Sequence, residues 1–180
     1  MFDPAKIRFR RLRASDLELM HTWLNTDPVM RWYGNKPCSY DEVVQEYVPS
    51  INGQQPTDPF LILYEEIPIG YIQTYKIADY PDYSRYVQVD EDAAGLDLFI
   101  GEAQYIHRGL GSLVLTRFLR EIVFQGSDTV SCLVGPEPQN TVAIKAYEKV
   151  GFRYLKTIQL PDKAEPESLM RIAREDVLGG

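Results

Sequence analysis

The chain has 180 residues, of which 44% are apolar and 25% are charged, a balance that fits one ordinary globular domain and excludes a fibrous or disordered protein. Its 26 acidic residues outnumber the 19 basic ones, for a formal net charge of -7 at pH 7. This excess argues against a nucleic-acid partner, whose phosphates would be repelled, and is compatible with a small cationic partner. Because many soluble proteins are mildly acidic, charge alone does not decide the function.

The cysteines and histidines point to neither a disulfide scaffold nor a metal site. Cys38 and Cys132 are far apart and lack the pattern of a secreted framework. His21 and His107 belong to no ligand-spaced cluster, so no metal is expected. The first residues contain no signal-peptide stretch, and no segment predicts a membrane span. We therefore expect a cytoplasmic protein without membrane or nucleic-acid partners; the sequence indicates no oligomeric state.

The N-terminal third predicts one strand and two helices. Residues 6–11 alternate apolar and basic side chains, as a strand does. Ser15 and Ser39 each stand three residues before a glutamate, which is the capping-box pattern of a helix start. Apolar residues at helical spacing follow, to about Asn25 in the first case and to near Pro49 in the second.

The middle of the chain changes to a strand pattern. Residues 60–64 and 69–77 are rich in strand-forming side chains, and residues 65–68 between them suit a hairpin turn. Residues 78–94 contain five acids and no regular period, so we expect a loop there. A loop of that length inside a compact domain is usually functional or mobile.

The C-terminal half alternates strands and helices. Strands are expected at 96–100, 130–134, 152–158 and 169–172, and helices at 109–125 and 139–150. This order is typical of an α/β (α+β) domain in which helices cover a mixed sheet. No repeat, linker or low-complexity tract interrupts it, so residues 1–180 are expected to form a single domain.

Glycines open the helix expected at 109–125. Gly109 and Gly111 allow the backbone to approach a ligand, and free amides with the helix dipole stabilise an anion such as phosphate. Arg108 can add a cation beside them. A tight turn would need the same glycines, so the motif alone leaves both interpretations open. A Walker A loop is excluded because no Gly-Lys-Ser/Thr follows, and a dinucleotide fingerprint fits poorly.

The helix expected at 139–150 carries two polar candidates. Asn140 lies near the helix start, where its side chain can bond either a ligand amide or a backbone group. Ala143 and Tyr147 share its face, since offsets of three, four and seven coincide on a helix. Tyr147 as a plain core aromatic is the alternative.

Together these two segments resemble the GNAT superfamily of acyltransferases. The superfamily signature Gln/Arg-x-x-Gly-x-Gly/Ala corresponds to residues 106–111, with Ile106 in the first position, and its second cofactor segment corresponds to residues 140–152. The resemblance implies acetyl-CoA as cosubstrate and a mixed, mostly antiparallel sheet, flanked by helices and splayed at the acetyl-CoA site. It implies acetyl-CoA contacts from Phe99, Ile100, His107, Arg108, Gly109, Leu110, Gly111, Ser112, Asn140 and Ala143. Tyr147 would protonate the leaving thiolate.

Amine acetylation needs a neutral amine, a polarised thioester carbonyl and a proton acceptor. Asp97 interrupts an apolar strand beside the glycine turn, where its carboxylate can bind an ammonium group and take its proton. A strand residue facing solvent is the alternative for Asp97. Glu102 is a second carboxylate nearby, and a backbone amide near Phe99 can donate to the thioester oxygen.

The chain also resembles the aminoglycoside 6'-N-acetyltransferases over about residues 7–155. The matching segments are 32–34, 46–49, 67–75, 95–102 and 147–152. The resemblance implies acetylation of the 6'-amino group of an aminoglycoside antibiotic, conferring resistance, with Asp97 as base or amine anchor. The other substrate-binding residues would be Tyr33, Tyr47, Gln73, Glu102 and Glu137, and acids of 79–92 would add charge.

One position departs from that pattern. Some enzymes of the family carry an aspartate just before the proline of the Asn140 loop, where it contacts the antibiotic, and this chain has Gly135. The departure affects the substrate and leaves the acetyl-CoA site untouched.

Two alternatives stay open. The amine can instead belong to a siderophore precursor, a polyamine or a protein N-terminus. A non-catalytic acyl-CoA-binding domain is the second alternative, against which Asp97 and Tyr147 argue, because a binder needs neither.

Overall fold

The computed structural model describes residues 1–179. Its strands form one open sheet of seven in the order β1-β2-β3-β4-β5-β7-β6, mostly antiparallel and flanked by helices, which confirms the predicted fold class. The chain groups into two compact units. Unit 1 comprises Met1–Gln73 and Asp97–Arg108, and unit 2 comprises Thr74–Leu96 and the chain from Gly109 onward. Strands β3 (Ile67–Lys76) and β4 (Ala93–Ile100) each pass from one unit into the other.

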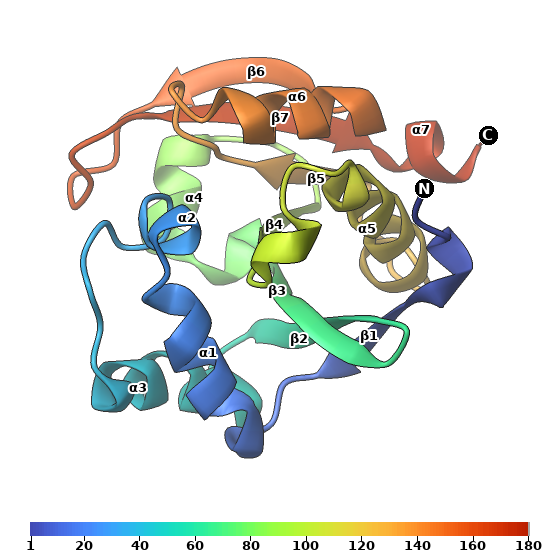
Figure 1. Cartoon of the computed structure of the whole chain (residues 1–180). Helices are drawn as coiled ribbons and strands as arrows, with labels where there is room; N and C mark the ends of the chain where they lie inside the picture. Colours follow the sequence, from blue (N-terminus) through green and yellow to red (C-terminus); the bar gives the residue numbers. More distant parts are fainter. Residues whose placement is uncertain (180) are drawn as a thin grey trace. The chain divides into compact units, whose positions relative to one another are not determined.

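Unit 1 combines strands with three helices. Its remaining elements are η1 (Pro4–Lys6), β1 (Ile7–Arg11), η2 (Ala14–Asp16), α1 (Leu17–Leu24), α2 (Asp27–Met30), α3 (Tyr40–Ile51), β2 (Thr57–Tyr64) and η4 (Ala103–Tyr105). Strands β1 and β2 pair antiparallel, with Ile7 opposite Tyr64. Helix α3 lies against α1 and β2, as Figure 1 shows in blue and cyan.

The core of unit 1 is formed by the apolar stripe of α1. Leu17, Met20 and Leu24, the apolar residues that recur at helical spacing in this helix, are all buried, together with Trp23. Fully burying a side chain of this size stabilises the fold by about 1.5–3 kcal/mol. The same cluster includes residues of α3, β2, β3 and β4, so it packs α1 against these elements.

The two predicted helix starts had different outcomes. Ser39 caps α3 as expected, since its hydroxyl accepts from the Glu42 amide and the Glu42 carboxylate accepts from the Ser39 amide. The capping box at Ser15 was wrong, because Ser15 lies inside η2. Instead the carboxylate of Asp16 accepts from the Arg13 amide at 2.8 Å, and α1 begins one residue after Asp16.

Unit 2 holds the other strands and four helices. Its elements are η3 (Ile77–Asp79), α4 (Pro81–Val87), α5 (Leu110–Phe118), the π-helical turn η5 (Leu119–Val123), β5 (Ser131–Val134), α6 (Thr141–Val150), β6 (Arg153–Ile158), β7 (Glu167–Ala173) and α7 (Arg174–Leu178). Strand β7 pairs antiparallel with both β5 and β6, the latter visible above it in Figure 1. Helices α5 and α6 contact each other.

Strands β4 and β5 run parallel but pair only briefly. The pairs join Ala93–Gly95 to Ser131–Leu133, three positions of the eight-residue β4. The strand then continues to Ile100. A short parallel pairing of this kind is in keeping with the predicted splay of the sheet.

The loop predicted at 78–94 was wrong, since η3 and α4 occupy half of it. Pro81 stands at the first position of α4, where proline is well tolerated. Several of the acids in this segment are engaged in ion pairs within unit 2. These pairs are Asp82 with Arg85, Asp92 with Lys76 and Glu91 with Arg171. Their charge is therefore largely neutralised by local cations.

Candidate active site

The structure brings Asp97 and Gln73 together in unit 1. The amide nitrogen Nε2 of Gln73 on β3 donates to Oδ2 of Asp97 on β4 at 2.9 Å. On the other side of the amide, the Tyr71 hydroxyl donates to Oε1 of Gln73 at 2.6 Å. Asp97 is half-buried and Tyr71 is buried. A carboxylate held in this way within a strand has both the charge and the fixed geometry that amine binding requires.

An aromatic cluster adjoins this pair through Tyr71. The ring centroids of Tyr47 and Tyr71 lie 5.3 Å apart, and those of Tyr33 and Phe99 lie 5.0 Å apart. Burial raises the pKa of the Tyr47 hydroxyl, and the charges of Glu46 and Asp97 raise it further. The rings of Tyr71 and Phe99 lie 5.7 Å apart between centroids, so the predicted substrate residues Tyr33 and Tyr47 belong to one aromatic cluster.

Glu102 is held by a core residue. The indole nitrogen of Trp23 donates to Oε1 of Glu102 at 2.8 Å. Gly101 leaves room for that indole, because a Cβ there would lie 2.3 Å from the Trp23 ring. The predicted second carboxylate is therefore fixed to α1, which the sequence did not indicate.

The glycine turn before α5 has the shape expected of an anion site. His107 and Gly109 adopt left-handed backbone angles, with φ of 58° and 81°. Gly109 is the N-cap of α5 and no side chain caps it, so the first amides of the helix lack partners within the helix. A Cβ on Gly109 or Gly111 would meet no described atom within 4 Å. The Ser112 hydroxyl donates to the Gly109 carbonyl at 3.1 Å and closes the turn.

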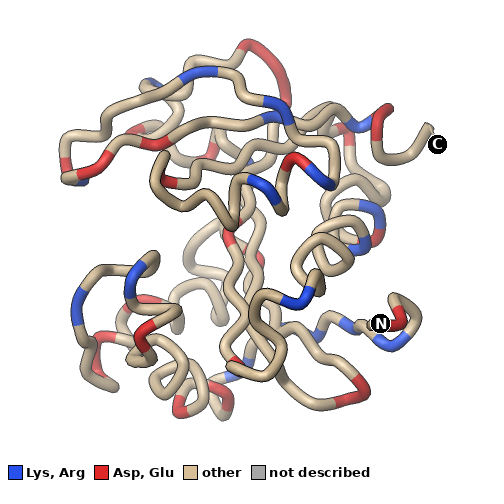
Figure 2. The backbone as a smooth tube through the Cα atoms, turned by 45° about the horizontal axis from the view of Figure 1, so that its top comes forward, with Lys and Arg blue, Asp and Glu red and all other residues tan. Residues whose placement is uncertain are grey.

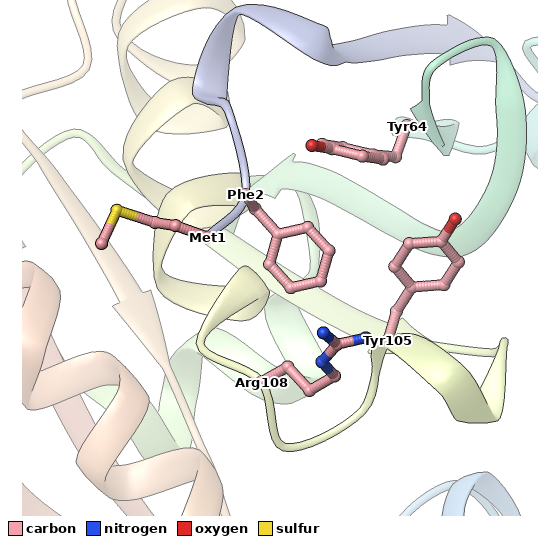
Figure 3. Close-up of a pocket in the computed structure, with 5 residues that line it drawn as sticks. All are labelled: Met1, Phe2, Tyr64, Tyr105 and Arg108. Carbon is pink, nitrogen blue, oxygen red and sulfur yellow. The ribbon is translucent and has the colours of Figure 1, made fainter.

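Two neighbouring side chains of this turn lie very differently. Leu110 is completely buried, so only its backbone amide can serve a ligand. Arg108 is exposed, and its guanidinium stacks over the Phe2 ring at 5.2 Å while Nη1 donates to the Gln104 carbonyl at 3.2 Å. Around it lies a cavity of about 330 Å³ (Figure 3), lined by Met1, Phe2, Tyr64, Tyr105 and Arg108. No local sequence pattern indicated that Phe2 would support Arg108.

The predicted residues Asn140, Ala143 and Tyr147 belong to α6 and its N-cap, in unit 2. Asn140 is its N-cap, and Oδ1 accepts from the Ala143 amide at 3.2 Å, so this oxygen serves the backbone. The Tyr147 ring is buried and lies 5.5 Å from Phe152 in an edge-to-face contact. The Glu137 carbonyl accepts from the Asn140 amide at 2.9 Å, which shapes the loop before the helix.

A carboxylate stands beside Gly135 that sequence reasoning missed. A Cβ at position 135 would lie 2.4 Å from Oε2 of Glu167, a residue of β7 that is buried. The Tyr83 hydroxyl donates to Oε2 of Glu167 at 3.0 Å, and Lys163 Nζ donates to Oε1 at 2.7 Å. The Glu167 carboxylate thus occupies the space that a side chain at position 135 would need.

The predicted residues divide between the units. Unit 1 contains Tyr33, Tyr47, Gln73, Asp97, Phe99, Ile100, Glu102, His107 and Arg108; unit 2 contains Gly109, Leu110, Gly111, Ser112, Glu137, Asn140, Ala143 and Tyr147. Both units carry more acidic than basic residues, and Figure 2 shows the two kinds interspersed along the chain. Within residues 1–179, no helix is long and apolar enough to pass through a bilayer, and no His, Cys, Asp or Glu side chains are grouped as metal ligands.

Comparison with known proteins identifies the family. Residues 13–160 match the family model of the acetyltransferase (GNAT) domain. The chain belongs to the GNAT acetyltransferases. The resemblance drawn from the glycine turn and the α6 segment is thereby confirmed, and the GNAT match includes residues of both units.

Relatives of this GNAT chain act on aminoglycosides. It is 29% identical to the aminoglycoside N(6')-acetyltransferase type 1 of Klebsiella pneumoniae over 158 residues, which are 87% of this chain and 78% of the relative. It is also similar to the structure of AAC(6')-Ib in complex with parmomycin and acetyl-CoA, at 29% identity, a TM-score of 0.85 and 95% of both chains. The complex of AAC(6')-Ib with coenzyme A and kanamycin matches at 28% identity, a TM-score of 0.83, and 94% and 96% of the two chains.

Proposed function

We propose that this GNAT enzyme transfers the acetyl group of acetyl-CoA to the 6'-amino group of aminoglycoside antibiotics in the cytoplasm, and so confers resistance. The observation that carries the proposal is the likeness to AAC(6')-Ib, which extends over 95% of both chains. That AAC(6')-Ib structure is a complex with the aminoglycoside parmomycin and acetyl-CoA. The acidic balance of the chain supports it, since aminoglycosides are polycations. We also propose that residues 1–180 make up a single GNAT domain.

The start of α5 supplies what the acetyl-CoA pyrophosphate needs. Bound acetyl-CoA would supply the activated thioester. The backbone amides of residues 107–112 would hold the pyrophosphate, because the left-handed turn and the uncapped helix start expose them. Arg108 would add positive charge. Asn140 would reach the pantetheine arm through its amide nitrogen, since its side-chain oxygen caps α6.

Asp97 would act on the acceptor amine. Its carboxylate would bind the 6'-ammonium group and take one proton, which leaves a neutral nitrogen able to attack the thioester carbon. The backbone amide near Phe99 would donate to the carbonyl oxygen as negative charge develops there. Tyr147 would give a proton to the departing thiolate. Tyr33, Tyr47 and Gln73 would line the sugar site, with Glu102 and Glu137 as further carboxylates.

The proposal is tested by thiol release from acetyl-CoA with purified protein, against kanamycin, tobramycin, spermidine and a hydroxylated lysine. We expect saturable turnover on kanamycin, and a loss of roughly 10²–10⁴-fold in kcat/KM for Asp97→Asn, because the proton acceptor is removed. Binding of acetyl-CoA by Asp97→Asn should be unchanged. Turnover of spermidine or the lysine derivative in place of every aminoglycoside would reject the substrate and keep the GNAT reaction.

A further inference from the structure

We propose that Tyr71 is a positioning residue, which sets the orientation of the Gln73 amide and through it the Asp97 carboxylate. The inference rests on the proposed role of Asp97 in binding and deprotonating the amine. Tyr71 itself is 1% exposed, so it is too buried to touch an acceptor substrate. Its influence on the reaction therefore passes through Gln73.

The hydrogen bonds allow one orientation of the Gln73 amide. An ionised carboxylate only accepts hydrogen bonds, so the NH₂ end of the amide must face Asp97. The carbonyl end then meets the Tyr71 hydroxyl, which donates to it at 2.6 Å. The reversed amide would set an oxygen against Asp97 and turn the tyrosine from donor to acceptor. Both ends of the amide thus favour the same state.

Tyr71 is fixed by the rings around it. Its ring lies 5.3 Å from Tyr47 on α3 and 5.7 Å from Phe99, which follows Asp97 by two residues on β4. Contacts of this kind leave little freedom to rotate, because buried side chains are closely packed. The Tyr71 hydroxyl therefore reaches Gln73 from a closely packed ring. The Gln73 amide in turn donates to Oδ2 of Asp97, and this hydrogen bond fixes the rotation of the carboxylate.

Tyr71→Phe removes only the hydroxyl and keeps the ring. We expect kcat/KM for the amine to fall roughly three- to tenfold, the value of one hydrogen bond, with KM for acetyl-CoA unchanged. In a Gln73→Met background, which has no amide to orient, the same substitution should change kcat/KM by less than about twofold. The double-mutant cycle thus separates an effect through Gln73 from general damage.

Thr74→Val is the matched control. Thr74 follows Gln73 on β3, and its buried hydroxyl donates to the Gly95 carbonyl at 2.9 Å. The Thr74→Val substitution should lower thermal stability by an amount similar to Tyr71→Phe and leave kcat/KM unchanged. A loss in Tyr71→Phe that is matched by Thr74→Val, or that persists in full in the Gln73→Met background, would overturn the inference.

A second measurement does not need turnover. The side-chain amide signals of Gln73 in ¹⁵N-edited NMR spectra can be assigned by their absence in Gln73→Met. We expect one proton of the pair to be shifted far downfield by the carboxylate, and this shift to shrink in Tyr71→Phe as the amide gains freedom. Identical Gln73 amide signals in the wild type and in Tyr71→Phe would overturn the role of Tyr71. Absence of turnover on every amine would reject the proposed function instead, and the NMR result would still decide the inference.

Discussion

Among single residues, Gly135 shows how one missing side chain defines its surroundings. A methyl group there would overlap Oε2 of Glu167, whose carboxylate is held by Tyr83 and Lys163. The neighbour in this case is the end of the Glu167 side chain, which two hydrogen bonds hold in place, so moving it aside would strain them. We therefore expect a side chain at 135 to crowd the Glu167 carboxylate.

Gly135→Ala should lower the free energy of unfolding by about 1–3 kcal/mol, the usual result of overpacking. Urea denaturation of the two proteins measures it. Gly111→Ala is the control, since its added Cβ meets no described atom within 4 Å and it lies inside α5. Equal unfolding free energies for wild type and Gly135→Ala would show that Glu167 yields without cost.

Among the elements, the start of α5 is the proposed pyrophosphate site, and Arg108 in the preceding turn is the cation proposed to serve it. Arg108→Ala should raise KM for acetyl-CoA roughly tenfold with little change in kcat, because charge-assisted contacts to phosphate are worth a few kcal/mol at most. Steady-state kinetics with acetyl-CoA varied at saturating amine measure this. Arg11→Ala is the matched control, since Arg11 is also an exposed cation, stacked 5.1 Å over Phe60. A similar rise for both variants would count against a specific role.

The segment before β4 is tied to the strands of unit 2 by Glu91. Its carboxylate accepts from Arg171 on β7 at 2.6 Å and from Ser131 on β5 at 2.7 Å. The hydrogen bond from Arg171 is the main cause of a lowered pKa for Glu91, and Ser131 adds to it. Because the folded pKa lies below the ordinary value of 4.5, the stabilisation is complete above that pH and disappears as pH falls through the lowered pKa.

Glu91→Gln should therefore destabilise the protein by about 1–2 kcal/mol at pH 7, an amount typical of a partly buried charged hydrogen bond. The difference from wild type should shrink as the pH drops below about 4.5. Urea denaturation at pH 7, 5 and 3.5 measures it. A difference that stays constant over this range would mean that the charge of Glu91 contributes nothing.

At the scale of the whole molecule, local signals in the sequence predicted most elements and failed where neighbours compete. The capping box at Ser39 was confirmed because both partners lie in one turn. The equivalent pattern at Ser15 failed because the adjacent Asp16 takes over the turn. Helix α4 was missed because seven residues are too few to show a helical period.

The candidate site was predictable in its residue types and only partly in its contacts. Asp97 was predicted from its place in an apolar strand and Gln73 from the family resemblance, whereas the hydroxyl of Tyr71 behind them depends on how β3 and β4 lie side by side. The support of Arg108 by Phe2 joins the two ends of unit 1, and no periodic pattern reports a contact so distant in sequence. The spacing of apolar residues predicts which face of a helix or strand is buried. It does not predict which other element packs against that face.

The overlap between positions 135 and 167 also constrains how this enzyme can evolve. A lineage that first gained a side chain at 135 would pass through a destabilised intermediate, because the Glu167 carboxylate occupies that space. The reverse order, with Glu167 shortened first, removes the obstacle but also removes the carboxylate that Tyr83 and Lys163 bind. The two positions should therefore change together, and a newly acquired carboxylate at 135 should be found together with a small residue at 167.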